Sequence, residues 1–268
     1  MAAKKVKVAV IQMVSSPRVE ENCLLAEKLL HQASKEGTQW AVLPEYWPLI
    51  GKQEQDKVSI GEDEGEGPLQ NRLKEWAKKF NLTLFAGSIS LRSPEKGKIY
   101  NSLLTFSPQG TLKGRYDKIH LFNYRGERES YLESTTIMPG QGFGPKRLEV
   151  DSWQVIEALC FDVRFADFFF NAHPFEVLVL PAAFTYETGQ AHWEILVRSR
   201  AIENQVYVLA AAQGGTHDNG RRTYGRSMIV DPWGAVLAQA KEGNDVVYAT
   251  LDPDYLKAIR QKLPIFPL

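Results

Sequence analysis

The hydrophobic positions along the chain change period repeatedly, from the alternation of strands to the spacing of helices. Residues 6–13 alternate and are rich in β-branched side chains, which predicts a strand. Residues 20–35 carry apolar side chains at a spacing that predicts a helix with one buried face, and the apolar run 40–43 predicts a short buried strand. The same criteria predict further helices at 69–80, 164–172, 191–204 and 253–262, and further strands at 82–91, 100–106, 112–116, 154–160, 177–180, 206–212, 227–230, 236–240 and 246–251.

Two of the predicted strand pairs are joined by turns of the same form. Residues 107–110 (Ser-Pro-Gln-Gly) join the first pair, and residues 231–234 (Asp-Pro-Trp-Gly) join the second. This similarity suggests two related halves, and no Pro-, Gly- or Ser-rich linker separates them. Short strands that are nearly all apolar need cover on both faces of their sheet. The pattern therefore predicts an α/β protein in which residues 1–268 form one domain, with a long loop-rich stretch at 117–142.

Composition and charge exclude several classes of protein. Hydrophobic residues make up 44% of the 268 positions, so we expect a large core rather than disorder. Lys plus Arg and Asp plus Glu both total 32, which argues against a nucleic-acid partner. No apolar stretch reaches the ~18 residues of a membrane span, so we expect no membrane partner. At the N-terminus, Gln12 interrupts the apolar run, which favours a strand over a signal peptide.

The chain contains two cysteines, Cys23 and Cys160, which are too few for a disulfide framework. A reducing compartment is the natural setting for free thiols, so we expect a cytoplasmic protein. Cys23 falls within a helical pattern, where a buried cysteine is a common small core residue. The spacing of potential ligands indicates no metal site, and we expect no cofactor.

Three candidate catalytic residues each lie where a predicted strand ends. Cys160 ends an apolar run, a position at which α/β sheets build sites, although a buried core cysteine is the alternative. A thiol with an ordinary pKa near 8.5 needs a base, and none of the five histidines matches a local Cys-His pattern. Glu45 follows a buried strand and offers a partly desolvated carboxylate, or else a solvated loop acid. Lys118 offers a cation, or else a surface lysine.

At these positions the chain closely resembles the nitrilase superfamily of carbon–nitrogen hydrolases. The family's glutamate motif is matched by Leu43-Pro44-Glu45, its lysine motif by residues 117–122 (Asp-Lys-Ile-His-Leu-Phe), and its cysteine motif by residues 160–165 (Cys-Phe-Asp-Val-Arg-Phe). Ordered matches elsewhere extend the resemblance over nearly the whole chain; they lie at 8–13, 100–102, 133–134, 139–140, 200–204, 224–227 and 231–234.

The resemblance implies a four-layer α-β-β-α sandwich with two mixed β-sheets. It also implies a Glu-Lys-Cys triad at Glu45, Lys118 and Cys160, and it suggests that Glu133 is a second glutamate near the lysine that helps to position substrate. Relatives commonly pair, so a homodimer or larger homo-oligomer is expected. Asp162, Arg164 and His120 are expected to be structural: the first two steady the cysteine turn, and His120 braces the lysine loop.

Within the superfamily, Cys160-Phe161-Asp162 resembles the amidase branches. Residues 184–185 (Phe-Thr) and 189–194 resemble the branch that acts on ω-amido acids and deaminated glutathione. The resemblance thus implies hydrolysis of a small carboxamide, which is the expected partner, through a Cys160 thioester, with Phe161, Phe184 and Thr185 in contact with substrate. Two alternatives stay open: a nitrilase or N-carbamoyl amidohydrolase with the same triad, and a catalytically silent binding protein on this fold.

Overall fold

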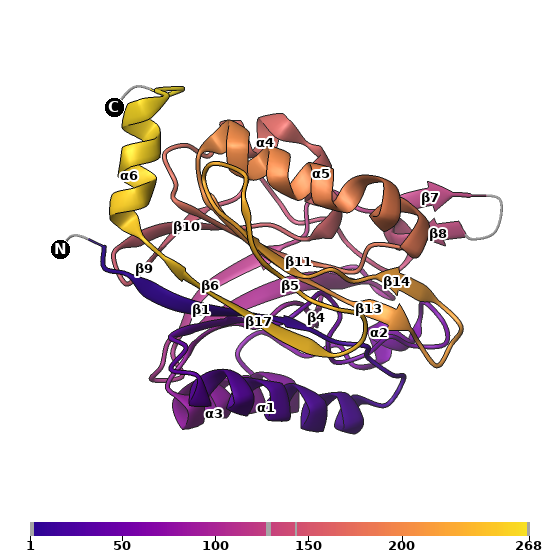
Figure 1. The fold of residues 1–268 in the computed structure, drawn as a ribbon. Helices are drawn as coiled ribbons and strands as arrows, with labels where there is room; N and C mark the ends of the chain where they lie inside the picture. Colours follow the sequence, from indigo (N-terminus) through magenta and orange to yellow (C-terminus); the bar gives the residue numbers. More distant parts are fainter. Residues whose placement is uncertain (1–2, 127–129, 143, 267–268) are drawn as a thin grey trace.

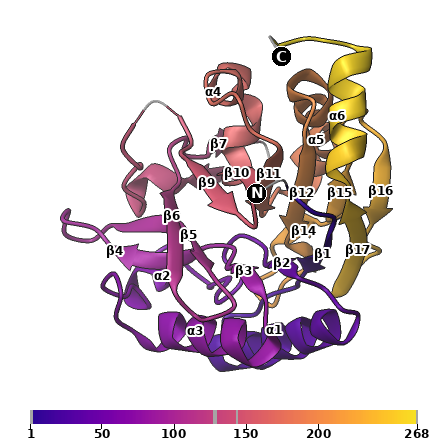
Figure 2. The same ribbon diagram turned by 90° about the vertical axis from the view of Figure 1, so that its left-hand side faces the viewer.

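Two β-sheets lie face to face between two layers of helices in the computed structural model of the chain, which describes residues 3–126, 130–142 and 144–266. Figure 1 shows α1 and α3 below the sheets and α4 and α5 above them, and Figure 2 shows the same layers from the side. This arrangement confirms the predicted four-layer α-β-β-α sandwich. Both sheets are mixed, as predicted, because each contains parallel and antiparallel pairs.

The first sheet is built mainly from the N-terminal half of the chain. Its strand order is β17-β1-β2-β3-β5-β4, with β6 paired to β5. The C-terminal strand β17 pairs with β1 along its whole length, so the two ends of the chain meet in this sheet. The strands are β1 (Val6–Gln12), β2 (Trp40–Val42), β3 (Thr83–Phe85), β4 (Ile89–Arg92), β5 (Ile99–Phe106), β6 (Leu112–Asp117) and β17 (Asp245–Leu251).

The second sheet comes from the C-terminal half and has the order β16-β15-β12-β11-β10-β9. Its three central strands are parallel and entirely or largely buried, as expected for strands covered on both faces. The strands are β9 (Arg147–Val150), β10 (Trp153–Glu157), β11 (Val177–Ala182), β12 (Tyr207–Ala212), β15 (Met228–Val230) and β16 (Val236–Gln239).

The helices cover the outer faces, and two small hairpins lie beside the sheets. The helices are α1 (Val19–Lys35), α2 (Asp56–Ser59), α3 (Pro68–Phe80), α4 (Ala166–Phe170), α5 (Tyr186–Asn204) and α6 (Pro253–Lys262), with short 3-10 turns η1 (Glu133–Thr135) and η2 (Cys160–Arg164). The hairpins are β7 (Asn123–Arg125) with β8 (Ser130–Leu132), and β13 (Gly214–Thr216) with β14 (Arg222–Tyr224).

Burial divides the core into two main layers. One cluster joins the facing sheets and includes Trp40, Phe85 and Trp153. The other joins the first sheet to α1 and α3 and includes Trp47 and Trp76. Each layer removes large aromatic surfaces from water, which is the main favourable term for such a fold.

The structure departs from the predicted elements at two places that matter for the site. The predicted strand 82–91 is two strands, because Gly87 takes a φ of 55° and turns the chain between β3 and β4. The predicted strand 154–160 ends at Glu157, and Cys160 begins η2 instead. The predicted helix 164–172 is correspondingly shorter, Ala166–Phe170. The stretch 117–142 holds β7, β8 and η1, although residues 127–129 lie outside the described chain.

Candidate active site

Three strands of the sandwich bring the predicted catalytic residues together. Glu45 lies three residues beyond the end of β2, Lys118 directly follows β6, and Cys160 lies three residues beyond β10. Glu45 and Lys118 are 1% and 2% exposed, and Cys160 is 7% exposed. Glu45, Lys118, Glu133 and Cys160 all line one inner pocket of about 30 Å³. Residues that follow strands of both sheets therefore line one small, buried pocket.

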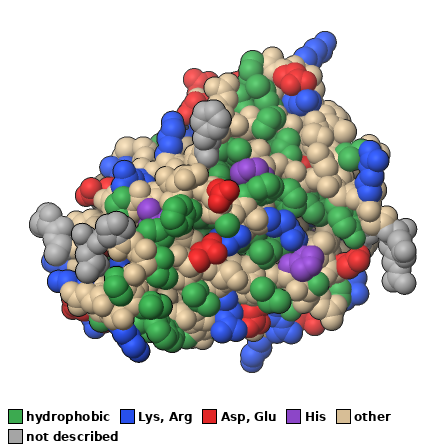
Figure 3. Space-filling model, turned by 90° about the horizontal axis from the view of Figure 1, so that it is seen from above, with side chains coloured by type: hydrophobic (Ala, Val, Ile, Leu, Met, Phe, Trp, Pro, Cys, Tyr) green, Lys and Arg blue, Asp and Glu red, His purple; other side chains and the backbone are tan. Residues whose placement is uncertain are grey.

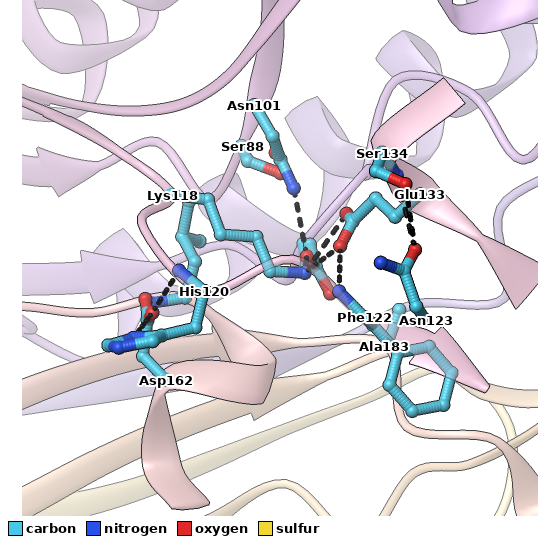
Figure 4. Close-up of polar contacts among 12 residues, drawn as sticks. Ser88, Asn101, Lys118, His120, Phe122, Asn123, Glu133, Ser134, Asp162 and Ala183 are labelled. Atoms are coloured by element: carbon cyan, nitrogen blue, oxygen red, sulfur yellow. Dashed lines mark hydrogen bonds and ion pairs between the residues drawn. The ribbon is translucent and has the colours of Figure 1, made fainter. Parts of the chain in front are cut away.

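Lys118 contacts both carboxylates of the pocket. Its Nζ donates to Glu45 Oε1 at 3.0 Å and to both Glu133 oxygens, Oε1 at 3.0 Å and Oε2 at 2.8 Å. Figure 4 shows the lysine side chain extending towards Glu133, with Asn101 on the other side. Asn101 Nδ2 donates to the same Glu45 oxygen at 2.9 Å. These two contacts fix the orientation of the Glu45 carboxylate. Both end on Oε1, so neither Lys118 nor Asn101 occupies Oε2.

Glu133 is held by more than the lysine. Its Oε1 accepts from the Tyr46 hydroxyl at 2.6 Å, and its Oε2 accepts from the backbone N–H of Phe122 at 2.7 Å. All the hydrogen bonds are to the charged form of the carboxyl, which they favour. Glu133 therefore anchors the ammonium group of Lys118 from one side while Glu45 contacts it from the other.

The charges in the pocket set the protonation states. Burial alone would lower the pKa of Lys118, but Glu133 and Glu45 raise it well above its ordinary value, so the ammonium stays charged. Burial would raise the pKa of Glu133, but Lys118 and then Lys57 lower it below its ordinary value. Burial, and then the charge of Glu45, raise the pKa of the Cys160 thiol well above its ordinary value. The free thiol is therefore protonated at neutral pH.

The turn that carries Cys160 is held by Asp162. Cys160 has a φ of 47°, a left-handed conformation that is uncommon for a residue with a side chain. The fully buried Asp162 accepts from the backbone N–H of Leu159 at 2.9 Å and from the Tyr116 hydroxyl at 2.7 Å. It also accepts from the backbone N–H of His120 at 3.0 Å, and its Oδ1 lies 2.8 Å from His120 Nδ1 (Figure 4). These contacts tie the cysteine turn to the lysine loop.

A narrow crevice of about 10 Å³ lies on another side of Cys160. Phe161, Phe184 and Thr185, the predicted substrate contacts, all line it. Arg164 also lines it, and its guanidinium carbon lies 5.6 Å from the Phe161 ring centroid and 5.1 Å from that of Phe184. The Arg164 cation therefore lies beside the crevice next to the thiol, and the structural role predicted for it stays a prediction.

Sequence reasoning gave no role to two residues that complete the site, Tyr46 and Asn101. Tyr46 directly follows Glu45, where no periodic pattern marks it, and it takes a φ of 52° to reach Glu133. Asn101 belongs to one of the matched motifs, but its bond to Glu45 depends on how β5 lies against the loop after β2. The one sequence signal for Asn101 was its place as a polar residue in a predicted strand that is largely apolar.

Other kinds of site have little support in the part of the chain that the structure describes. There, no group of three or more His, Cys, Asp and Glu side chains is arranged to hold a metal ion. No helix among the described residues has the length and apolarity that crossing a bilayer requires.

Comparison with known proteins decides the family. The sequence model of the carbon–nitrogen hydrolase family matches residues 7–261. The chain belongs to the carbon–nitrogen hydrolase family. This hydrolase is 36% identical over 260 residues to deaminated glutathione amidase of Synechocystis sp., covering 96% of this chain and 95% of that protein. It is 35% identical over 269 residues to omega-amidase NIT2 of Xenopus tropicalis, covering 97% and 94%.

Solved structures agree with this assignment. Nit3 of Saccharomyces cerevisiae, a member of branch 10 of the nitrilase superfamily, has a TM-score of 0.88 at 30% identity and covers 98% of this hydrolase and 96% of that chain. NitFhit of C. elegans also has a TM-score of 0.88, at 33% identity over 99% of this chain; the hydrolase spans 65% of that protein. The resemblance to the nitrilase superfamily is thereby confirmed.

Proposed function

We propose that this carbon–nitrogen hydrolase is an amidase that cleaves a small carboxamide to an acid and ammonia or an amine. The observation that carries the proposal is the contact of one lysine with two buried carboxylates in a pocket that also contains a thiol. Names of relatives, deaminated glutathione amidase and omega-amidase, favour amides over nitriles as substrates. We further propose that residues 1–268 act as one domain.

In the proposed reaction Glu45 is the base and then the acid. The protonated thiol of Cys160 gives its proton to Glu45 as the sulfur attacks the amide carbonyl, which forms the C–S bond. Lys118 and the backbone N–H of Phe161 stabilise the negative charge on the former carbonyl oxygen. The C–N bond then breaks, and the leaving nitrogen takes the proton from Glu45.

Hydrolysis of the thioester completes the cycle. Glu45 removes a proton from water, the water oxygen attacks the thioester carbonyl, and the C–S bond breaks to release the acid. The proton returns to sulfur, so the enzyme regains its starting state. Glu133 acts as a positioning residue in this scheme, because its contacts hold the ammonium of Lys118 beside Glu45.

We propose that the substrate carries a carboxylate on its acyl side and that Arg164 binds it. Burial lowers the pKa of Arg164 from its ordinary value, and among the described residues Arg164 has no carboxylate partner within ion-pair distance. Its hydrogen-bonding contact is His192 Nδ1 at 3.3 Å. A half-buried guanidinium without an anionic partner is suited to a bidentate carboxylate. Because the crevice is narrow, Phe161, Phe184 and Thr185 would restrict the acyl chain to a short one.

The proposal is tested by a panel of small ω-amides, nitriles and N-carbamoyl amino acids, assayed for ammonia and acid release. We expect turnover of an ω-amide of a short dicarboxylic acid, and loss of that turnover in Cys160→Ala. Cys23→Ala is the matched control, since Cys23 is buried in the core cluster of α1 and should not affect turnover. Nitrile or carbamoyl turnover without amide turnover would overturn the amidase assignment. Silence across the panel would favour a binding protein.

We also propose that the enzyme is a cytoplasmic homo-oligomer. Apolar side chains are exposed on the face over α4 and α5, mixed with charged ones (Figure 3). Ile195 and Ile202 on α5 are 68% and 46% exposed, and Phe170 at the end of α4 is 60% exposed. Exposed apolar surface of this kind often marks contact between proteins.

A further inference from the structure

The peptide group between Glu45 and Tyr46 is held at both of its polar ends. Its carbonyl oxygen accepts from Gln213 Nε2 at 3.1 Å, and its N–H donates to Ser88 Oγ at 2.9 Å. Gln213 and Ser88 are fully buried, so bulk water does not compete for either contact. Because a peptide group is a rigid plane, the two contacts together determine how this one is rotated.

The rotation of this peptide group determines where two side chains of the pocket point. Tyr46 takes a φ of 52°, in the left-handed region that is uncommon for a residue with a side chain. From that conformation its hydroxyl reaches Glu133, while the Glu45 carboxylate contacts Lys118. A strained conformation persists only where the surrounding structure prevents its relaxation. Release of the peptide would therefore displace the base of the proposed mechanism.

The two contacts come from different sheets. Ser88 lies between β3 and β4 of the first sheet, whereas Gln213 directly follows β12 of the second. The backbone of Gln213 forms a bridge with Met13, which directly follows β1, and the N–H of Gly214 donates to the Met13 oxygen at 2.9 Å. Gln213 thus lies where the two sheets are joined, and its side chain reaches the loop that carries Glu45.

Contacts with Ser15 fix the orientation of the Gln213 amide. The backbone N–H of Ser15 can only donate, and it donates to Gln213 Oε1 at 3.1 Å, so Nε2 is the atom that faces Glu45. The same Nε2 donates to Ser15 Oγ at 2.8 Å, and that hydroxyl donates to the backbone oxygen of Trp47 at 2.8 Å. Both N–H groups of the amide are therefore used, which restricts its rotation.

His217 holds the backbone of Ser15 in place. The Ser15 carbonyl oxygen can only accept, so His217 Nδ1 donates to it at 2.8 Å, and Nε2 accepts from the Thr223 hydroxyl at 2.7 Å. Burial lowers the pKa of His217 to about 4, so the ring is neutral at neutral pH and keeps this tautomer. Buried, uncharged hydrogen bonds therefore support the contact between Gln213 and Glu45.

We propose that Gln213 is a positioning residue: from the second sheet it holds the peptide after Glu45, opposite Ser88 from the first, and thereby keeps the Glu45 carboxylate beside the thiol. The inference rests on the proposed amidase function. Gln213 is not among the described residues that line the inner pocket, so it acts through Glu45 and not on the substrate.

The test replaces Gln213 by methionine, which has a similar length and shape but no amide. Gln213→Met should lower kcat for succinamate by roughly ten- to hundredfold, because a small misplacement of a reacting group has a cost of that order. KM should change little, since Glu45 transfers protons and does not bind the substrate. In the Glu45→Gln background, Gln213→Met should lower kcat by no more than about twofold, because the group through which it acts is already lost.

The titration of Cys160 gives a second readout that needs no turnover. Burial, and then the charge of Glu45, raise the pKa of the Cys160 thiol. A displaced Glu45 carboxylate should therefore leave this pKa lower in Gln213→Met than in wild type. Thiolate absorbance against pH measures it, and the Cys160 step is the one that Cys160→Ala removes. A glutamine that only stabilised the fold would leave this step where it is.

Gln70→Met is the matched control. Gln70 on α3 is also buried, and its amide hydrogen-bonds within residues 62–66, on the outer side of the first sheet. Gln70→Met should lose stability to denaturant as Gln213→Met does but keep the wild-type kcat and thiol pKa. Ser88→Ala releases the other end of the same peptide with a small change in volume, so it should fold and should also lower kcat and the thiol pKa.

The outcomes separate the positioning role from the amidase function. Wild-type kcat and thiol pKa in Gln213→Met would overturn the proposal, as would losses in kcat that multiply with those of Glu45→Gln. If Gln213→Met does not fold, the same two measurements on Ser88→Ala decide in the same way. Absence of amide turnover in wild type would overturn the amidase function; a lowered Cys160 pKa in Gln213→Met would then still support the positioning role, and an unchanged one would overturn it.

Discussion

In the proposed mechanism, Cys160 gains its reactivity from a neighbouring base rather than from a low pKa. Many reactive cysteines lie in electropositive, partly exposed places that stabilise the thiolate. Here burial and then Glu45 raise the pKa of the thiol, while Lys118 and the backbone of Ala183 lower it by less. The proposed mechanism therefore requires proton transfer to Glu45 to accompany attack, which would keep the thiol protonated until a substrate fills the pocket.

Glu45→Gln should make the Cys160 thiol more acidic and at the same time lower amide turnover. Removal of the Glu45 charge leaves Lys118 as the dominant neighbour of the sulfur, so the pKa of Cys160 should fall, whereas amide turnover should fall by roughly a hundredfold or more because the proton acceptor is gone. Ultraviolet absorbance of the thiolate, followed against pH, measures the first effect.

Burial also raises the pKa of the Cys23 thiol, to about 11, so its step has to be subtracted from this titration. The Glu45→Gln/Cys160→Ala double variant identifies the step that belongs to Cys160. A Cys160 step that stays in place or moves to higher pH in Glu45→Gln would contradict the charge arrangement described here.

At the scale of elements, the site depends on how the chain turns after each strand. Gly87 separates β3 from β4 and lies against the loop that carries Glu45. A Cβ at Gly87 would lie 2.1 Å from the backbone oxygen of Pro44 and 2.7 Å from that of Leu43. This close approach leaves no room for a side chain at position 87. The glycine therefore allows the backbone just before Glu45 to pass directly against it.

Gly87→Ala should therefore reduce both stability and turnover. We expect the free energy of unfolding to fall by about 2 kcal/mol or more, because the backbone cannot move away without displacing Glu45. Gly97→Ala is a matched control: Gly97 also has a positive φ, of 84°, but a Cβ there meets nothing within 4 Å. Denaturant unfolding and kcat measure the effects, and equal losses in the two variants would show that strain at φ, not the contact with Pro44, is responsible.

Period and apolar content were enough to predict most elements and an α/β fold with sheets covered on both faces, whereas the four-layer sandwich was implied by the family resemblance. β1, α1, α3 and α6 lie within one residue of their predicted bounds. The short hairpins were not predicted, because two strands of three residues carry too little pattern to distinguish from loop. The start of α5 at Tyr186 was missed because Thr185, its N-cap, precedes a polar first turn.

Their positions at strand ends marked Glu45, Lys118 and Cys160 as candidate site residues. The family resemblance, and not their spacing, indicated that the three act together. Contacts between distant segments could not be predicted from spacing. Arg221 and Lys57 are 164 residues apart in numbering yet line the same pocket. The two residues come close together only because the fold packs distant segments against each other. No local sequence pattern predicts that packing.

At the scale of the whole molecule, the carboxyl of Glu157 is buried where the two sheets face each other. Glu157 on β10 is 4% exposed and accepts a short hydrogen bond from Thr105 on β5 of the other sheet. Burial raises its pKa from 4.5 to about 7. The protonated form is favoured in the folded protein, so its contribution to stability is complete below about pH 4.5 and is lost as the pH rises through about 7.

Glu157→Gln should remove this dependence. The neutral amide keeps the shape of the protonated carboxyl, so relative to wild type the variant should gain about 3 kcal/mol in free energy of unfolding between pH 4.5 and pH values above 7. Denaturant unfolding across this range measures it, with Glu149→Gln on the exposed side of β9 as control. Parallel curves for Glu157→Gln and wild type would contradict the assignment of a raised pKa.

The proposed mechanism requires the amide carbon to become bonded to Cys160 during turnover. Intact-protein mass spectrometry after acid quenching of the enzyme turning over succinamate tests it most directly. We predict an increase in mass equal to the acyl group, located on the peptide that contains Cys160, released by hydroxylamine and absent from Cys160→Ala. Turnover that persists in Cys160→Ala, or an adduct located on Cys23 instead, would rule out Cys160 as the nucleophile.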